Sequence, residues 1–323
     1  MLSLGDPAPS NMAMASPSPE LSIIIPAYNE EKRLGPTLEH IRAYLATRPF
    51  GLEPHEVEVV VVDDGSVDGT ARVVQNYTDR FHSLRLVSNG INRGKGYSVR
   101  HGMHEARGRI ALFADADMSL PIEEAEKLLS AIGEGNDIAI GSRAIQRSLM
   151  ETHPPLTRRI AGAVFNFLVR LLIGLPFHDT QCGVKAFVLD RCWTIFDSQR
   201  VERFGFDPEI LFLAQRQGLK TAEVAVRSSH DPASKVRVLR DGVTMFLDIL
   251  RIRWNWTMGR YPQLEMFSST LTDSRTIRPA APVLDPAAEK STGKNVRVIW
   301  SGISARSKGE RKGNPPVIGP ASL

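Results

Sequence analysis

The 323-residue sequence contains only two cysteines, Cys182 and Cys192. Two cysteines are too few for a disulfide framework or a cysteine-rich metal cluster, so we expect a reducing, cytosolic setting. The sequence also lacks an uninterrupted apolar run of the roughly 18 residues that a membrane span needs. The nearest approach, residues 160–177, is broken by Asn166 and Arg170. The first twenty residues have no basic start followed by an apolar stretch, so no secretory signal is expected.

The charge distribution gives no indication of a nucleic-acid partner. The formal net charge is +4, and residues 262–323 hold nine Lys or Arg against five Asp or Glu, which accounts for this excess. The rest of the chain is balanced, so no basic binding face is predicted. Residues 1–20 and 262–323 lack apolar periodicity, and we expect them to be a disordered leader and a disordered basic tail. The folded domain is predicted at residues 21–261.

Between these ends, short apolar runs alternate with helical spacing. Strands are predicted at residues 21–26, 57–62, 84–87, 110–114 and 137–140. Apolar residues in the intervening segments recur at helical steps of three and four, as in Leu34, Leu38, Ile41 and Leu45. Repeated βα units imply an α/β, Rossmann-like fold, in which helices flank a mostly parallel sheet. Functional residues are then expected in the loops that follow the strands.

The most informative stretch is residues 110–121, where an apolar run ends in Asp115 and Asp117, separated by Ala116. A strand that ends in this way delivers two carboxylates to the edge of the sheet that binds ligands. Residues two apart in an extended chain point to the same face, so both carboxylates can reach one ion. Hard oxygen ligands suit Mg²⁺ or Mn²⁺, completed by water and substrate phosphates. An ordinary polar turn is the alternative, because the motif is short.

Three further loops carry polar residues: Pro26-Ala27-Tyr28-Asn29-Glu30, Asp63-Asp64-Gly65-Ser66 and Asn92-Arg93-Gly94-Lys95-Gly96. We interpret Asp64 as an acceptor for a pyrimidine N–H or ribose hydroxyls, and Tyr28 as a ring that packs against the base. Ser66 or Asp68 could instead cap the next helix. The glycines of the third loop would let backbone approach a ligand, and Lys95 could meet a phosphate. The loop matches neither Walker A nor GxGxxG, which argues against a nucleotide hydrolase or dehydrogenase.

These motifs, in this order, resemble those of the family 2 glycosyltransferases of the GT-A fold. The matching stretches are SIIIPAYNE, VVVDDGS, NRGKG and FADAD, followed by Gly141-Ser142-Arg143, Arg158-Arg159, DTQCGVK at residues 179–185 and FGFD at residues 204–207. The second group is similar to polyprenyl-phosphate glycosyltransferases, and DTQCGVK is most similar to dolichyl-phosphate β-glucosyltransferases. The resemblance covers residues 21–261. It implies a GT-A sheet flanked by helices, with amphipathic helices near the C-terminal end.

The resemblance also implies residue roles. The donor nucleotide would be held by Pro26, Ala27, Tyr28, Glu30, Asp64, Lys95, Asp115, Ala116 and a late lysine, Lys235. Asp115 and Asp117 would hold the divalent ion, although Met118-Ser119-Leu120 departs from mannosyl relatives and leaves a third metal contact open. Arg143, Arg158 and Arg159 would face phosphate, that of the acceptor in particular. Asp179 either braces the turn that follows it or lines the reaction centre, orienting the sugar or an arginine.

The expected reaction follows from the chemistry of the acceptor. A lipid monophosphate is largely a dianion at neutral pH and needs no strong base, so the enzyme supplies position and charge stabilisation. We expect inverting, metal-dependent transfer of glucose from UDP-glucose to a polyprenyl phosphate, dolichyl or undecaprenyl. The alternatives are GDP-mannose or another donor, a soluble acceptor, and a non-catalytic nucleotide-sugar-binding protein.

Two apolar helical stripes favour peripheral attachment at the cytoplasmic face of a membrane. One covers residues 161–175, with Arg158, Arg159 and Arg170 along it. The other comprises Leu239, Val243, Phe246, Leu247 and Leu250, flanked by Arg240, Arg251 and Arg253 and followed by Trp254 and Trp256. Basic amphipathic helices with tryptophans suit an anionic bilayer surface. Packing within the domain or in a dimer gives the same spacing, so the oligomeric state stays open.

Overall fold

The computed structural model describes residues 18–146, 156–228 and 238–261. All of them belong to one compact unit, residues 1–273, and a second unit, residues 274–323, lies outside the described residues. Most of the predicted leader, the whole predicted tail and Lys235 therefore also lie outside them.

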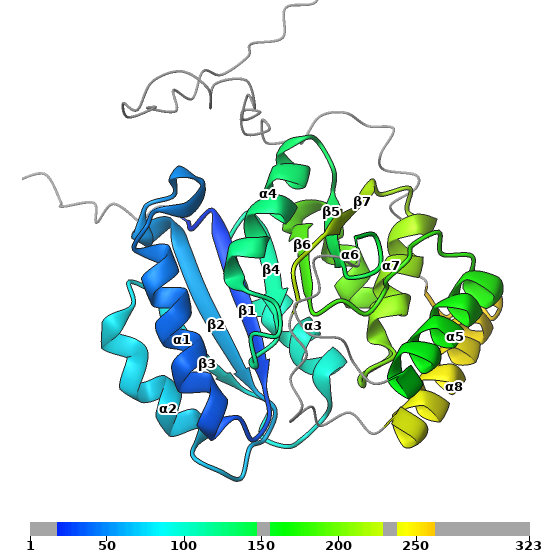
Figure 1. Cartoon of the computed structure of the whole chain (residues 1–323), viewed down its shortest axis with the longest axis horizontal. Helices are drawn as coiled ribbons and strands as arrows, with labels where there is room; N and C mark the ends of the chain where they lie inside the picture. Colours follow the sequence, from blue (N-terminus) through cyan, green and yellow to red (C-terminus); the bar gives the residue numbers. More distant parts are fainter. Residues whose placement is uncertain (1–17, 147–155, 229–237, 262–323) are drawn as a thin grey trace, which may run out of the picture. The chain divides into compact units, whose positions relative to one another are not determined.

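The described residues form a seven-stranded sheet in the order β3-β2-β1-β4-β6-β5-β7 (Figure 1). The strands are β1 (Leu21–Ala27), β2 (Val57–Asp63), β3 (Leu84–Ser88), β4 (Ile110–Ala114), β5 (Ile138–Ser142), β6 (Val184–Val188) and β7 (Thr221–Ala225). In this sheet β6 runs antiparallel to β4 and β5, and the other pairs are parallel. The predicted mostly parallel α/β sheet is confirmed.

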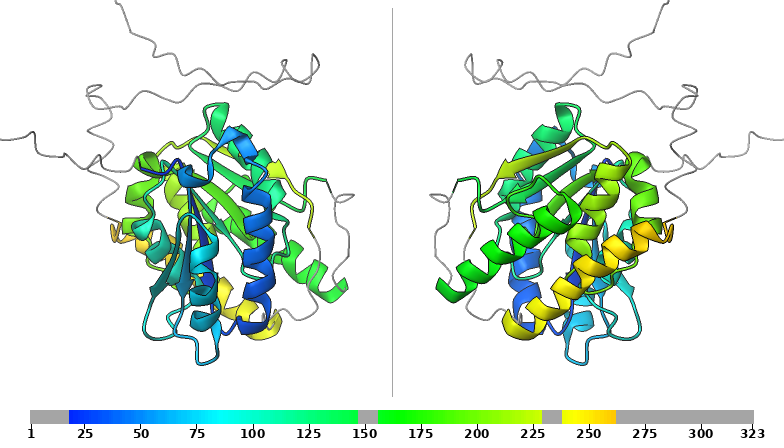
Figure 2. Two further views of the ribbon diagram at one scale, coloured as in Figure 1. Left: turned by 90° about the vertical axis from the view of Figure 1, so that its left-hand side faces the viewer. Right: turned by 90° about the vertical axis from the view of Figure 1, so that its right-hand side faces the viewer.

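Helices cover both faces of this sheet (Figures 1 and 2). They are α1 (Glu31–Leu45), α2 (Thr70–Tyr77), α3 (Lys95–Glu105), α4 (Ala125–Gly133), α5 (Leu156–Ile173), α6 (Leu189–Ser198), α7 (Phe206–Arg216) and α8 (Val238–Thr257). Helices α1, α2 and α4 share one apolar core with Ile23 and Ile25, whereas α3 and α5–α8 share the other core with Ile24. Because alternate strand residues point to opposite faces, β1 serves both cores.

The central strands are buried on both sides, as parallel sheets require. Every residue of β2 is buried, and Val59, Val60, Val61 and Val62 are fully so. Complete burial of each such side chain contributes about 1.5–3 kcal/mol. This continuous apolar run fixes the middle of the sheet and leaves the strand ends to carry polar side chains.

The carboxyl ends of the parallel strands meet at one edge of the sheet. Ala27 at the end of β1 pairs with Asp63 at the end of β2, and Asp63 pairs with Ser88. Ala114, the last residue of β4, pairs with Val184, the first residue of the antiparallel β6. The loops singled out by the sequence, together with the segment that precedes β6, therefore emerge side by side.

Candidate active site

The two predicted metal ligands lie in a tight turn after β4. Met118, whose backbone adopts a left-handed φ of 49°, donates its N–H to the Asp115 carbonyl at 3.2 Å. The Ser119 N–H donates to Asp117 Oδ1 at 3.0 Å. From α1, the Thr37 hydroxyl donates to the Ala116 carbonyl at 2.7 Å. These bonds fix the backbone of the turn, while the Asp115 and Asp117 side chains stay 27% and 23% exposed.

Cationic side chains border this carboxylate pair. Lys95 Nζ lies 2.5 Å from Asp115 Oδ1, and Arg33 Nη1 lies 4.0 Å from Asp117 Oδ2. Burial opposes the charge of Lys95, but the charges of Asp115, Asp207 and Asp117 raise its pKa. Burial and the neighbouring Asp115 charge raise the pKa of Asp117. The two carboxylates repel each other, and a cation between them relieves that repulsion.

The chemistry of this pair fits a Mg²⁺ or Mn²⁺ ion. Both ligands are hard carboxylate oxygens on partly exposed side chains that follow a buried strand. Within the described segments, no group of three or more His, Cys, Asp or Glu side chains could hold a metal ion. An ion at Asp115 and Asp117 would accordingly take its other ligands from substrate phosphates and water, as Mg²⁺ commonly does.

Asp64, the predicted nucleotide contact, holds the loop at residues 92–96. Its buried carboxylate accepts hydrogen bonds from Asn89 Nδ2 at 2.8 Å, from the Arg93 N–H at 2.9 Å and from the Gly94 N–H at 2.8 Å. A carboxylate has about four acceptor positions, and these bonds fill three of them among the described residues. The nucleotide role of Asp64 stays a prediction, as does that of Tyr28, whose side chain is 39% exposed.

The first two loops are bound to each other. The Asn29 N–H donates to Ser66 Oγ at 2.9 Å, and the Glu30 N–H donates to Thr70 Oγ1 at 2.8 Å. Ser66 thus tethers the first loop, whereas Asp68 accepts from the Thr70 N–H at 3.0 Å at the start of α2. The capping alternative is not confirmed for Ser66 or Asp68, because the N-cap of α2 is Gly69 and no side-chain cap bond is present there. The side chain of Glu30 pairs with Arg33 at 2.7 Å.

The glycines of the third loop allow close packing against another segment. A Cβ on Gly94, where φ is +107°, would lie 2.5 Å from the Glu202 carbonyl oxygen. A Cβ on Gly96 would lie 2.7 Å from Phe206 Cβ and from the Val201 carbonyl oxygen. Both glycines thus let the loop pack on residues 201–206, and their expected approach to a ligand stays a prediction.

Arg143 and Asp179 form the opposite side of the site. Arg143 Nε donates to Asp179 Oδ2 at 2.7 Å, and Nη2 donates to Oδ1 at 3.0 Å. Asp179 Oδ1 also accepts from the Gln181 N–H at 3.2 Å, so the carboxylate braces its own turn and orients an arginine. Burial would raise the pKa of Asp179, but Arg143 lowers it. The charge of Asp179, with a further contribution from Asp115, raises the pKa of Arg143.

A buried ion pair behind the carboxylates was not assigned from the sequence. Lys185 Nζ in β6 donates to Asp207 Oδ1 at 2.5 Å and to the Cys182 carbonyl at 2.8 Å. Both charged side chains are buried, and a side chain on Gly183 would collide with Asp115 Oδ2. Burial raises the pKa of the Cys182 thiol to about 12, so this cysteine packs rather than reacts. The sequence feature that could have indicated this ion pair is Lys185, a lysine within an otherwise apolar stretch.

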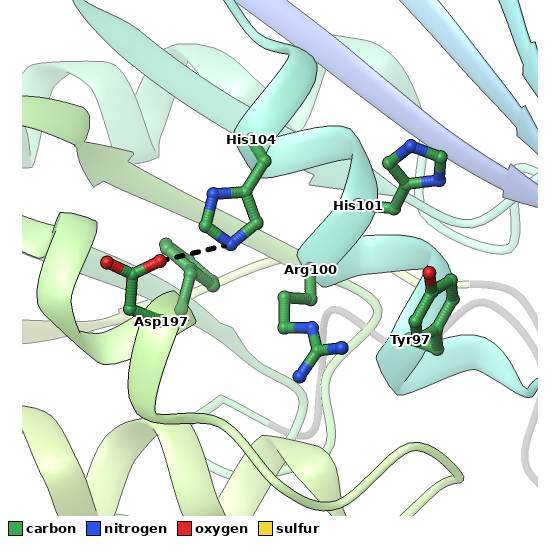
Figure 3. A pocket seen from close by; sticks show the side chains of 6 residues that line it. Tyr97, Arg100, His101, His104 and Asp197 are labelled. Carbon is green, nitrogen blue, oxygen red and sulfur yellow. Dashed lines mark ion pairs between the residues drawn. The ribbon is translucent and has the colours of Figure 1, made fainter.

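Other predicted residues are placed only in part. Arg158 and Arg159 belong to α5, but their side chains, like Lys235, lie outside the described residues. A hollow of about 250 Å³ opens between α3 and α6 (Figure 3). It is lined by Tyr97, Arg100, His101, His104, Phe196 and Asp197. His104 Nε2 lies 3.5 Å from Asp197 Oδ1, so these groups partner each other, and none of the predicted site residues lines this hollow.

Comparisons with known proteins agree with the resemblance. Residues 22–192 match the model of the family described as glycosyl transferase family 2. A dolichyl-phosphate beta-glucosyltransferase of Drosophila melanogaster is 38% identical over 255 residues, which covers 76% of this chain and 78% of that protein. One of Trichomonas vaginalis is 36% identical over 243 residues, 73% of each chain.

The fold agrees with a solved structure as well. Glucosyl-3-phosphoglycerate synthase from Mycobacterium tuberculosis, in complex with Mn²⁺, UDP-glucose and phosphoglyceric acid, has a TM-score of 0.52. The match covers 73% of this chain and 80% of that one at 18% identity, so the likeness is one of fold alone. The sheet, the ordered motifs and these relatives lead to one conclusion: the chain is a glycosyltransferase of the GT-A fold and belongs to glycosyl transferase family 2.

Proposed function

We propose that the protein transfers glucose from UDP-glucose to a polyprenyl phosphate of the dolichyl type, in a metal-dependent step that inverts the anomeric carbon. The observation that carries this proposal is the carboxylate pair Asp115 and Asp117 at the same sheet edge as the Arg143–Asp179 pair. The names of the Drosophila and Trichomonas relatives support glucose and dolichyl phosphate. The synthase crystallised with Mn²⁺ and UDP-glucose supports the donor and the ion.

The donor half of the reaction uses the carboxylate side of the site. Asp115 and Asp117 would hold Mg²⁺ or Mn²⁺, whose charge neutralises the departing nucleoside diphosphate when it is bound. Lys95, beside Asp115, adds a positive charge near the same diphosphate. Asp64 and Tyr28 would orient the uridine, because Asp64 keeps one acceptor position within the described residues and Tyr28 exposes an aromatic ring.

The acceptor half uses Arg143. Its Nε and Nη2 atoms are engaged by Asp179, whereas Nη1 has no partner within the part of the chain that the structure describes. We assign Nη1 to an oxygen of the acceptor phosphate, with Arg158 and Arg159 as further phosphate contacts. Because its pKa is lowered, Asp179 stays ionised as the counter-ion of Arg143 and takes no proton.

The displacement itself needs no general base. A phosphate monoester has a second pKa near 6, so at neutral pH a phosphate oxygen is already nucleophilic. That oxygen forms a bond to C1 of glucose while the bond from C1 to the diphosphate oxygen breaks. In-line attack converts an α-linked donor into a β-linked lipid phosphate, and positioning supplies much of the rate.

Peripheral contact with the cytoplasmic face of a membrane is the second part of the proposal. Helices α5 and α8 lie side by side (Figures 1 and 2). Each turns one apolar stripe into the core, through Phe165, Val169, Ile173, Met245, Ile249 and Ile252. A second stripe, here called the outer stripe, is 42–66% exposed and comprises Val164, Phe167, Leu171, Val243, Leu247, Leu250 and Trp254. Packing within the domain accounts for the first stripe only.

The outer stripe has the composition of an interfacial surface. It combines aliphatic residues with Phe167 and Trp254, and Arg251 and Arg253 adjoin it on α8. Such helices lie in the plane of an anionic bilayer and are not expected to cross it. Among the described segments, no helix combines the length and the apolar character that crossing a bilayer requires.

A donor and acceptor screen with the purified full chain tests the proposal. UDP-glucose and GDP-mannose, each radiolabelled in the sugar, are incubated with short-chain dolichyl phosphate or 3-phosphoglycerate, in Mg²⁺, Mn²⁺ or EDTA. We expect labelled lipid only from UDP-glucose with dolichyl phosphate, and only with metal. Labelled lipid from GDP-mannose would overturn the donor, and transfer to 3-phosphoglycerate at a similar rate would overturn the acceptor. Binding of UDP-glucose without any transfer would favour the non-catalytic alternative.

A further inference from the structure

We propose that Glu223 is a positioning residue that sets the direction of the Arg143 guanidinium by holding the backbone of Asp179. The inference rests on the phosphate role proposed above for Arg143. Glu223 lies in β7, which pairs with β5, the strand that ends just before Arg143. Its side chain is largely buried, 11% exposed, and contacts the backbone of Asp179.

Glu223 binds two consecutive backbone N–H groups. Its Oε1 accepts from the His178 N–H at 2.9 Å and from the Asp179 N–H at 2.8 Å. Its Oε2 lies 3.0 Å from the His178 backbone nitrogen and 3.1 Å from His178 Nδ1. Hydrogen bonds to an ionised acceptor are roughly twice as strong as neutral ones. The Asp179 backbone is therefore fixed by a carboxylate on a neighbouring strand.

The Asp179 side chain carries this constraint to Arg143. Its Oδ2 accepts from the Arg143 backbone N–H at 3.2 Å as well as from Nε, and its Oδ1 accepts from Nη2. Nη2 also donates to the Gln181 carbonyl at 3.2 Å. Both anchors of the guanidinium thus come from the segment in which the N–H groups of His178 and Asp179 bind Glu223. No direct bond joins Glu223 to Arg143 in the described residues, so the effect passes through Asp179.

The segment has few other anchors near Asp179. Residues 174–183 form no helix or strand, so their backbone groups need partners from elsewhere. Thr180 Oγ1 donates to Asn166 Oδ1 at a long 3.3 Å, and Gln181 Nε2 donates to the Phe204 carbonyl at 3.2 Å. Arg170 Nε donates to the Phe177 carbonyl at 3.0 Å, which holds the peptide that precedes His178. Within the described residues, none of these three contacts holds the peptide between His178 and Asp179. Without an acceptor at position 223, the Asp179 carboxylate can turn, and the Arg143 guanidinium turns with it.

The choice of substitutions separates this role from a general structural one. Glu223→Met removes both acceptors at similar size. Glu223→Gln keeps one oxygen at the Oε1 position, which reaches both N–H groups, and loses only the second bond of the His178 N–H, to Oε2. Glu223→Asp shortens the side chain by one carbon and serves if the methionine variant does not fold. His178→Ala is the matched control, because it removes only the imidazole contact and leaves both backbone bonds.

Steady-state kinetics with short-chain dolichyl phosphate give the first readout. We expect Glu223→Met, or Glu223→Asp in its place, to lose about tenfold in kcat/KM for the acceptor, with UDP affinity in calorimetry unchanged. Glu223→Gln and His178→Ala should stay within about twofold of the parent, since a neutral carbonyl oxygen still accepts hydrogen bonds. A loss of UDP affinity in proportion to kcat/KM would overturn the positioning role and indicate general loosening of the fold.

The second readout does not depend on catalysis. In ¹⁵N-labelled protein, the Nε–H of Arg143 is identified by its loss in Arg143→Lys, and its hydrogen bond to a buried carboxylate slows its exchange with water. We expect this slow signal in the parent and in Glu223→Gln, and its loss in Glu223→Met or Glu223→Asp. A slow signal unchanged in a folded Glu223→Met protein would overturn the inference. If Arg143→Lys kept full activity, the phosphate role proposed for Arg143 would be wrong. The Nε–H signal of Arg143 in the parent and in the Glu223 variants would still show whether Glu223 positions Arg143.

Discussion

Arg143 meets Asp179 through the Nε–Nη2 edge of its guanidinium, with donor–acceptor distances of 2.7 and 3.0 Å. That edge is one that arginine also presents to phosphates in bidentate pairs. Here it is used inside the chain, and Nη1 is the nitrogen without a partner among the described residues. The Arg143 side chain is 40% exposed, so a ligand can reach it. Arginine at this position therefore serves two purposes at once, one toward Asp179 and one toward a ligand.

Replacing Arg143 with lysine tests this double use. A lysine keeps the charge but cannot pair with Asp179 through two nitrogens while it presents a third to a phosphate. We expect Arg143→Lys to lower kcat/KM for the polyprenyl phosphate by at least about tenfold. Arg191→Lys is the control, because the half-exposed Arg191 also pairs with an aspartate, the buried Asp137, at 3.3 Å. Parental kcat/KM in Arg143→Lys would remove the arginine from the mechanism.

The lowered pKa of Asp179 gives a prediction for stability in acid. Because its pKa is lower in the folded chain than in the unfolded chain, its contribution is complete above the unfolded value, about 3.9. The contribution is lost as the pH falls through the lower, folded value. We expect Asp179→Asn to melt below the parent at pH 7, and the difference to narrow below about pH 4. Melting curves from pH 7 to pH 3 measure this, and a gap that stays constant throughout would contradict it.

Asp117→Asn should separate stability from activity. In the parent, burial and the charge of Asp115 destabilise the Asp117 carboxylate, and its pKa is therefore raised. An amide removes that repulsion, so we expect a melting temperature equal to or above that of the parent, whereas metal-dependent turnover is lost. Thermal melting and a Mn²⁺ titration of product formation measure both. Asp79→Asn, an exposed substitution in the short 3-10 helix Thr78–Arg80, should leave both unchanged. Parental rates for Asp117→Asn in excess metal would refute the metal assignment.

The parallel part of the sheet could be predicted because its signals are local. A strand such as β2 appears as a run of β-branched residues, and its predicted bounds differ by one residue from those observed. Strands β6 and β7 were not assigned. Strand β6 contains Lys185, whose charge is matched by Asp207 only after the chain has folded. Strand β7 is an edge strand of intermediate burial, so its apolar alternation is weak.

The candidate site could be predicted as a set of loops, but the pairings within it could not. The motifs identified Asp64 and Arg143 individually. Their partners depend on which strands become neighbours in the sheet. Only then does Asp64 hold the loop of Gly94, and only then does Asp179 orient Arg143. The glycines of NRGKG show the same limit, since their close approach to residues 201–206 is a tertiary contact that no local pattern encodes.

The outer stripe on α5 and α8 predicts that the protein binds anionic membranes. Phe167→Ser with Leu247→Ser removes one exposed apolar side chain from each helix, 61% and 57% exposed, and leaves the core-facing Val169 and Ile249 intact. We expect the parent to sediment with vesicles that contain anionic lipid and the double variant to remain mostly in the supernatant. Both should melt alike, because neither side chain belongs to the core.

Ile91→Ser is the matched control, because Ile91 is 70% exposed but belongs to the loop between β3 and α3 and to neither helix of the outer stripe. It should sediment like the parent. The double variant should also keep its rate with a short-chain acceptor in solution and lose rate with dolichyl phosphate embedded in vesicles, because only the second reaction requires the surface. Equal sedimentation of parent and double variant would exclude the outer stripe as the membrane contact. Loss of the short-chain rate would instead indicate that α5 and α8 shape the active site itself.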